Sequence, residues 1–499
     1  MSKKLFFKGV SYSYIRQIIT LITGIVSLPL LLNYFGTINY GIWILIVGLA
    51  GYINSISFGI PSAMTTLVAK TSNLNEKYQI LKKSFYLLGI ISFVFLSFFI
   101  FVLYFNDTWI IYLLGNIDEE FIPLTKNMFI LFVIFTLIKL PLNLYMQFFT
   151  GMNIIYISEV YQIATVIIGF VTVLIVVYLD LGILIFVLLW LVGQVIVNVI
   201  SVLHVFIKYN YLNIEEKSLQ SVNYNDIIKS GFAFFQVGIA ASLVWSTDNL
   251  VISHFLSPEL VTPYSIAFKI FTYIFIFSAI INGVIGPMYG NAYANNDWDS
   301  IRKFTSTIHK LLPIIGAYVW ISLIFFAKEV IILWTGKEEA FGGYLLVFSL
   351  GLYGYALSYV NTYATLVYSL NFANKTLNIA WSEAIINLLL SIVFIKFLGI
   401  GGVALGTALS ALFISLILPS IIKKITKDEI IYDFKYTKKH FLLLVFPLIL
   451  LALYSINFSI NEKIIIFIII SIAYGLFSWK LLLEEDRKIL MNIIKKRKQ

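Results

Sequence analysis

Long apolar runs alternate with short polar segments along almost the whole chain. A helix that crosses a bilayer needs about twenty mostly apolar residues, and about fourteen windows meet that requirement. The segments between them do not exceed about 25 residues, which is too short for a separate soluble domain. The pattern predicts an all-α integral membrane protein with spans near residues 13–34, 41–61, 84–105, 126–147, 160–179, 183–207, 231–255, 263–288, 308–333, 344–370, 377–397, 402–421, 441–459 and 464–483.

The first apolar run follows the basic start MSKKLFFKGV and so resembles a secretory signal. The run 13–34 is longer than the apolar part of such a signal, and it ends in PLLLNYFG without a small-x-small cleavage site. We therefore expect it to remain in the protein as the first span.

The composition agrees with the window pattern. Apolar residues make up 60% of the 499 residues, charged residues only 12%, and the mean hydropathy is +0.93. The chain has no cysteine, which excludes disulfides, thiolate metal ligands and cysteine nucleophiles. The net charge of +10 does not point to nucleic acid, because the basic residues lie in the segments next to the spans.

The distribution of lysine and arginine predicts the orientation. With the N-terminus inside, the cytoplasmic segments hold about 26 of these residues and the outer segments about five, and the opposite orientation would invert that ratio. The outer loops are acidic instead, as at Asp118 to Glu120 and at Glu338 and Glu339. We expect a multi-pass protein of the inner (plasma) membrane with both termini in the cytoplasm.

Glycine turns recur at an offset of about 221 residues, which indicates an internal repeat. Gly115 lines up closely with Gly336, and Leu181-Gly182-Ile183 faces Ile400-Gly401-Gly402-Val403. Six spans in each half would give the halves the same orientation, related by a pseudo-two-fold axis normal to the membrane. We predict one six-helix bundle at 1–210, another at 211–425, and two further spans with a basic amphipathic cytoplasmic tail at 426–499. The alternative is that turns between spans contain glycine at these positions by chance.

Several of these turns carry motifs of a known family. They are Tyr34-Phe35-Gly36-x3-Tyr40-Gly41, Phe58-Gly59-Ile60 with Thr65-Thr66, Gln147-x3-Gly151, Asp248 with Ile252, Tyr264-x2-Ala267-x-Lys269, and Leu398-Gly399-Ile400-Gly401-Gly402. In this order and spacing the chain resembles the oligosaccharide (O-antigen type) flippases of the multidrug/oligosaccharidyl-lipid/polysaccharide exporter superfamily. The resemblance covers about residues 1–425. Ser257 and Thr262 depart from it, because they stand where the family usually has glycines.

The resemblance implies a flippase that moves a polyprenyl-diphosphate-linked oligosaccharide from the cytoplasmic to the outer leaflet for cell-surface polysaccharide synthesis. The bilayer, a proton or sodium counter-ion and downstream polysaccharide assembly proteins are the further partners to expect. Two alternatives remain. One is a cation-coupled small-molecule (multidrug) antiporter, which usually has more carboxylates in its first spans. The other is a membrane glycan polymerase or glycosyltransferase, which generally has a large outer loop.

Ionisable residues inside spans are functional candidates by default, because each costs about 2.5–3.5 kcal/mol on insertion. Five qualify: Arg16, Lys139, Asp248, Lys269 and Glu383. Arg16 continues a polar stripe at helical spacing that suits a water-filled cavity, with the arginine as a cation for a phosphate. The alternative is that Arg16 extends to the inner membrane surface.

The other four residues also allow two interpretations. Asp248 and Lys269 lie at similar depth and could form a structural ion pair, or Asp248 could couple transport to a cation while Lys269 contacts phosphate. Lys139 precedes Pro141, so it could serve carbonyls freed by the proline or bind the ligand. Glu383 is a second candidate for ion coupling, or it reaches the inner interface.

The sequence indicates no cofactor and no catalytic residues. It has no paired-histidine or acidic cluster with metal-ligand spacing and no Walker A sequence. Together the patterns predict a transporter rather than an enzyme, with a cationic cavity formed by Arg16, Lys139 and Lys269 and with transport by alternating access.

Reporter fusions test the predicted orientation. Fusions at the two termini and in the loops around Lys77, Asn223, Lys303 and Lys435 are expected to report the cytoplasm, since these segments hold most of the positive charge. Fusions near Glu119 and Glu338 are expected to report the outside. A cytoplasmic signal at either glutamate would contradict the orientation and the two-bundle arrangement together.

Overall fold

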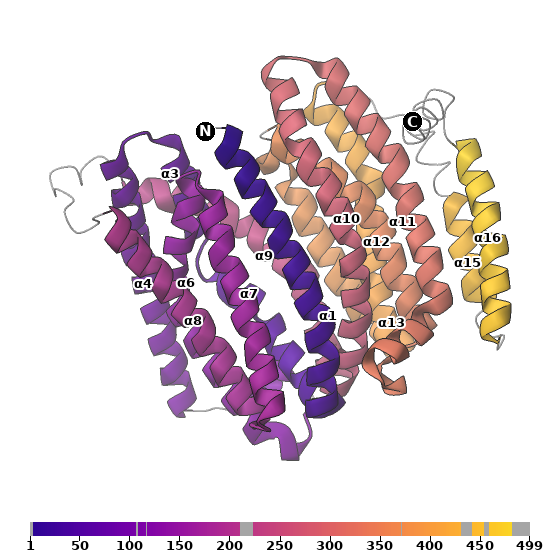
Figure 1. Cartoon of the computed structure of the whole chain (residues 1–499), viewed down its shortest axis with the longest axis horizontal. Helices are drawn as coiled ribbons and strands as arrows, with labels where there is room; N and C mark the ends of the chain where they lie inside the picture. The colour runs from indigo at the N-terminus through magenta and orange to yellow at the C-terminus, as the bar shows by residue number, and fades with distance from the viewer. Residues whose placement is uncertain are drawn as a thin grey trace. The chain divides into compact units, whose positions relative to one another are not determined.

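A computed structural model of the chain describes residues 3–105, 108–115, 117–209, 223–370, 372–430, 442–453 and 459–481. Within these ranges the chain is almost entirely helical and contains no strand. It divides into two compact units, Met1–Thr262 and Pro263–Gln499. Figure 1 shows the helices of both units.

The first unit contains nine α-helices and two short 3-10 helices in the part of the chain that the structure describes. They are α1 (Lys3–Gly48), α2 (Ala50–Ser55), α3 (Ile60–Lys70), α4 (Leu74–Phe105), α5 (Trp109–Leu114), η1 (Glu119–Phe121), α6 (Ile122–Gly151), α7 (Ile155–Tyr178), α8 (Gly182–Tyr209), α9 (Tyr224–Phe255) and η4 (Pro258–Leu260). Within it, α7 packs against α1, α6 and α8, as the N-terminal half of Figure 1 shows.

The second unit contains α10 (Val261–Ala294), which begins two residues before the division, and the helices that follow it. They are α11 (Trp298–Thr335), η5 (Glu338–Ala340), α12 (Tyr344–Ser369), η6 (Ala373–Thr376), α13 (Leu377–Ile425), η7 (Leu442–Leu444), α15 (Val445–Leu453) and α16 (Ile460–Leu481). Helix α12 is packed between α11 and α13 and is buried along most of its length.

The predicted fold class is confirmed: the chain is an all-α membrane protein. Every predicted window lies at least partly on helix, and nine helices in the described part of the chain are long and apolar enough to cross a membrane. The window 13–34 and the start of the window 41–61 lie on α1, and two windows lie on α13. A single residue in each helix, Gly36 and Gly399, departs from helical geometry between the two windows. The count of fourteen spans stays a prediction.

The second predicted window, 41–61, is not a continuous helix. The helix is interrupted after α2, where Phe58 (φ 49°) and Gly59 (φ 69°) adopt left-handed backbone conformations, and α3 then starts next to Pro61. A side chain at Gly59 would collide with the carbonyl oxygen of Gly231 on α9. The close approach of two backbones therefore accounts for the glycine in the Phe58-Gly59-Ile60 motif.

The glycine turns that suggested the repeat agree only in part. Gly115 and Gly336 both have positive φ angles, 98° and 74°, but their ψ angles are −153° and 8°. Gly182 has a φ angle of 78°, whereas Gly401 and Gly402, which face it in the repeat, lie within helix α13. At the turn where Ser257 replaces glycine, the backbone is extended and a 3-10 helix follows. Contacts assign α9 to the first unit, since it packs against α1, α2 and α3. The bundles at 1–210 and 211–425 stay a prediction.

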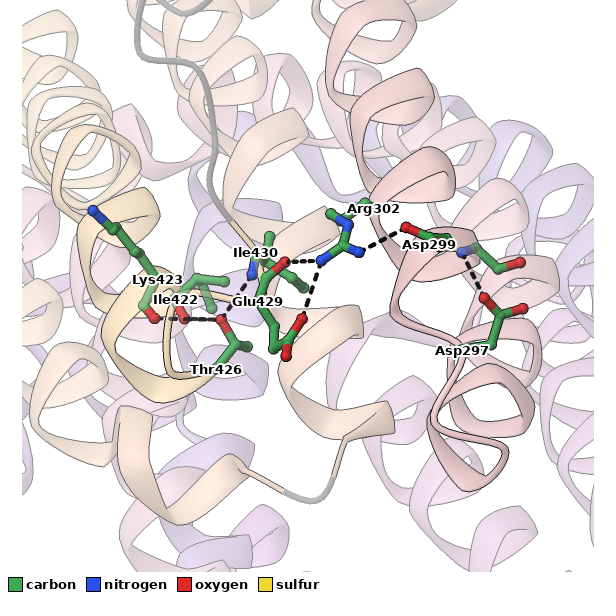
Figure 2. Close-up of polar contacts among 9 residues, drawn as sticks. Asp297, Asp299, Arg302, Ile422, Lys423, Thr426, Glu429 and Ile430 are labelled. Atoms are coloured by element: carbon green, nitrogen blue, oxygen red, sulfur yellow. Dashed lines mark hydrogen bonds and ion pairs between the residues drawn. The ribbon is translucent and has the colours of Figure 1, made fainter.

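A polar cluster joins the start of α11 to the end of α13 within the second unit (Figure 2). Arg302 donates to Asp299 Oδ1 at 2.7 Å and to the carbonyl and carboxylate oxygens of Glu429 at 2.9 and 3.1 Å. Asp297 caps α11 by accepting from the backbone N–H of Ser300, and hydrogen bonds from Ser300 hold the pKa of the Asp297 carboxyl below its ordinary value. The cluster therefore links the segment that follows α13 to the first turns of α11.

Helix α16, the last helix within the described residues, makes polar contacts with α11. Lys463 forms an ion pair with Glu329, Tyr318 donates to Ser471, and the Tyr474 hydroxyl donates to the carbonyl oxygen of Ile314 at 2.6 Å. These contacts hold the additional span on the preceding helices. The predicted basic tail lies outside the described residues.

Substitutions at two glycines test the close packing of the first unit. A Cβ at Gly41 would overlap the carbonyl oxygen of Pro258, so Gly41→Ala is expected to destabilise by about 1–3 kcal/mol and to lower the melting temperature. Gly89 on α4 has no atom within 4 Å of such a Cβ, so Gly89→Ala is the matched control. It is expected to be neutral or stabilising, by up to about 1 kcal/mol. Equal melting temperatures for the two purified variants would contradict the packing.

Candidate functional site

A polar cavity of about 620 Å³ lies within the first unit. Its walls come from α1, α3, α6, α7 and α8, and Phe234 on α9 adds one aromatic side chain. Two of the predicted site residues, Arg16 and Lys139, line it. The structure thus brings together two cations that are 123 residues apart in the sequence.

Arg16 is held by a carboxylate. Its Nε atom donates to Glu159 Oε2 on α7 at 2.6 Å, and the two side chains are 29% and 10% exposed. The bond uses only Nε, and in the part of the chain that the structure describes the two terminal nitrogens have no hydrogen-bond partner. Arg16 therefore lies in the cavity wall with its orientation fixed and with part of its planar fork available.

Lys139 is the second cation of the cavity. It lies on α6 two residues before Pro141, and its Nζ atom donates to Gln194 Oε1 on α8 at 2.7 Å. An amide partner orients the ammonium group without neutralising it. Lys139 is therefore a second basic group in the cavity wall, with its orientation set by an amide.

The remaining lining is mostly neutral and hydrogen-bonding. Hydroxyl and amide side chains come from one face each of four helices: Ser62, Thr65 and Thr66 on α3; Asn143, Gln147 and Thr150 on α6; Ser158, Gln162 and Thr165 on α7; Gln194 and Asn198 on α8. Such a surface matches a ligand rich in hydroxyl groups. Arg16 and Lys139 add two basic groups to this lining, and Glu159, which pairs with Arg16 without lining the cavity, offsets one of them. The excess of basic groups attracts an anion.

The other three predicted residues do not line this cavity. Asp248 lies on α9 in the first unit and is only 4% exposed, while Trp245, one turn earlier, is 47% exposed. The carboxylate of Asp248 is therefore directed into the protein, as expected for a charged group that lipid cannot solvate. Lys269 on α10 and Glu383 on α13 belong to the second unit. The Asp248–Lys269 ion pair and the roles of all five residues stay predictions.

Glu159 is the functional candidate that the sequence windows missed, because the fifth window starts at residue 160. The spacing contains a signal for it. Polar residues recur at positions 158, 159, 162 and 165 and again at 139, 143, 147 and 150, which is the helical interval of three or four residues. The periodicity that identified the polar stripe around Arg16 could therefore also have identified the polar faces of α6 and α7 that line the cavity.

Comparisons with known proteins agree on one family. A family profile described as "Polysaccharide biosynthesis protein" matches residues 6–292. The chain is 26% identical over 406 residues to a Salmonella typhimurium protein assigned as an O-antigen transporter, covering 80% of this chain and 91% of that protein.

Two solved structures have a similar fold. The lipid II flippase MurJ, in an inward closed conformation, matches with a TM-score of 0.69 and 18% identity, over 94% of this chain and 98% of its own. An inward-facing multidrug resistance transporter of the MATE family in the MOP superfamily also has a TM-score of 0.69, with 14% identity, over 84% of this chain and 99% of its own. At these identities the likeness concerns the fold alone.

A double-mutant cycle tests the Arg16–Glu159 pair. Arg16→Ala and Glu159→Ala each leave one charge without its partner in a partly buried site, so each is expected to cost about 1–3 kcal/mol of stability. The loss of unfolding free energy in the double variant is expected to be smaller than the sum of the losses in the two single variants. Thermal unfolding of the four proteins in one detergent measures this, and additive losses would show that the two side chains do not interact.

Proposed function

This chain belongs to the polysaccharide biosynthesis protein family, and from that premise we propose that it is a flippase for a lipid-linked oligosaccharide. It would carry the glycan headgroup of a polyprenyl diphosphate from the cytoplasmic to the outer leaflet of the inner membrane. The proposed activity is transport rather than catalysis. The role assigned to the Salmonella relative and the fold shared with MurJ both support it.

The observation that carries the proposal is the composition of the cavity in the first unit. A diphosphate keeps its charge away from bulk water only if cations or polar groups replace the lost hydration. Arg16 offers a planar fork that binds phosphate oxygens, and Lys139 offers a point charge on the neighbouring wall. The hydroxyl and amide groups around them match the hydroxyl groups of a glycan.

In this mechanism the headgroup enters the cavity from one side of the membrane and leaves on the other by alternating access. The lipid tail stays in the bilayer. Lys269 is proposed as a further phosphate contact, and Asp248 and Glu383 as sites for a proton or sodium counter-ion. Polysaccharide assembly proteins on the outer side would take up the product, and both termini would lie in the cytoplasm.

The multidrug antiporter is the competing proposal, because it has the same fold. The excess positive charge of the cavity favours the flippase, since an antiporter for cationic drugs requires carboxylates that are not already paired with arginine. Among the described residues that line this cavity there is no carboxylate, and Glu159 is paired with the lining residue Arg16.

Substitution of Arg16 tests the anion site. Arg16→Ala is expected to abolish glycan export, because the cation with bidentate geometry is lost, and Arg16→Lys is expected to restore part of it. In a strain that lacks the gene, the measurement is the fraction of lipid-linked oligosaccharide that reaches the outer leaflet.

Two controls separate function from folding. In the double variant Arg16→Ala/Glu159→Ala no charge is left unpaired, so it is expected to be present at near-normal amounts and still fail to export. Lys303→Ala removes one positive charge at an exposed position on α11 and is expected to export normally. Normal export by the double variant would exclude Arg16 from the anion site.

A further inference from the structure

Helix α8 places two buried amide side chains in the wall of the cavity. Gln194 is 6% exposed and Asn198 is 3% exposed, and both line the cavity. They are four residues apart, so they lie on one face of the helix, one turn from each other. They form a polar pair inside a span whose other residues are largely apolar.

The hydrogen bonds of each amide fix which of its atoms remains available. A lysine ammonium can only donate, so its 2.7 Å bond identifies Gln194 Oε1 as the acceptor and leaves Nε2 as the remaining donor. A backbone carbonyl can only accept, so the 2.8 Å bond from Asn198 Nδ2 to the Gln194 carbonyl leaves Asn198 Oδ1 as the remaining acceptor.

These two remaining atoms have no hydrogen-bond partner in the described protein. A buried polar atom left in this state costs about 1–3 kcal/mol, and here one donor and one acceptor occur within a single helical turn. The pair is complementary to a group that accepts and donates at the same time.

We propose that Gln194 and Asn198 form a subsite for a sugar of the transported headgroup, an inference that rests on the flippase function proposed above. Gln194 Nε2 donates to the sugar and Asn198 Oδ1 accepts from it. A sugar hydroxyl or an acetamido group provides both partners. An ionised phosphate has only acceptors, so it cannot bind Asn198 Oδ1.

The position of Lys139 identifies which sugar is bound. The Lys139 ammonium contacts Gln194 directly, so an anion at Lys139 lies immediately next to the amide pair. The sugar attached to the phosphate therefore occupies the subsite, and more distant sugars lie elsewhere. The amide pair makes the cavity selective for the group at the phosphate end of the glycan.

Three lipid probes test the subsite with the full chain in lipid nanodiscs. They are a polyprenyl diphosphate, the same lipid carrying one glucose, and the same lipid carrying one N-acetylglucosamine. The wild type is expected to bind at least one sugar-bearing lipid more tightly than the bare diphosphate. Asn198→Leu is expected to weaken that binding by roughly tenfold and to leave the bare diphosphate unchanged.

The two sugar probes distinguish the groups. A loss of binding for both sugar lipids assigns the subsite to a hydroxyl, and a loss for the N-acetylglucosamine lipid alone assigns it to the acetamido group.

Asn198→Ser is the second variant, because its hydroxyl can still donate to the Gln194 carbonyl but is too short to reach the sugar. Thr136→Val is the matched control: it deletes a buried hydroxyl of α6 that has no hydrogen-bond partner among the described residues and does not line the cavity.

The remaining outcomes count against the subsite. An equal loss for all three lipids, or no preference of the wild type for a sugar, would overturn it while the flippase proposal stands. Failure of the wild type to bind any of the three lipids would overturn the flippase proposal as well.

Discussion

Hydrocarbon offers neither hydrogen bonds nor charge screening to a polar side chain, and the arrangement of the first unit follows from that physical constraint. Its outer helix faces expose apolar residues such as Ile90, Phe93 and Ile200. Many of its polar side chains line one interior cavity, where they can bond one another. Arg16 is held by Glu159 and Lys139 by Gln194, each from a different helix. These side-chain bonds across helices keep four ionic or amide groups inside a span region that lipid surrounds.

The helices approach closely enough for such bonds because glycines remove side chains at the contacts. Gly41 lies against the Pro258 carbonyl, and Gly59 lies against the Gly231 carbonyl. Between helices in lipid there is little hydrophobic driving force, so association depends on packing of this kind. Some of the family motifs are therefore explained by contacts between helices rather than by contacts with a ligand. Gly41 and Gly59 have no side chain that could bind a ligand, but they allow the helices to lie close together.

The fold could be predicted from the sequence because membrane spans are local features. A run of about twenty apolar residues indicates a span wherever it occurs in a sequence. The glycine motifs at Gly36 and Gly399 also predicted two breaks in helical geometry, and both residues have positive φ angles in the structure. The Phe58-Gly59-Ile60 motif indicated a turn inside the window 41–61. Its contact with α9 could not be predicted, because that contact joins segments far apart in the chain. The site could be predicted only in part, because its single residues are local features and its contacts are not. Individual charges such as Arg16 and Lys139 stand out in apolar windows, but their partners are set by which helices pack together.

Glu159 illustrates what a transporter gains from a paired charge. Two unpaired cations in a low-dielectric cavity would repel each other and would cost several kcal/mol when no anion is bound. They would also hold a diphosphate so tightly that its release would be slow. A carboxylate on Arg16 offsets part of that charge and leaves one positive charge in excess. A site that must take up its ligand on one side of the membrane and release it on the other requires this moderate attraction, as conducting pores do. The neutral amide and hydroxyl groups around the pair can then supply selectivity without adding charge. In the proposed mechanism, attraction of the anion and recognition of the glycan therefore belong to different residues of one cavity.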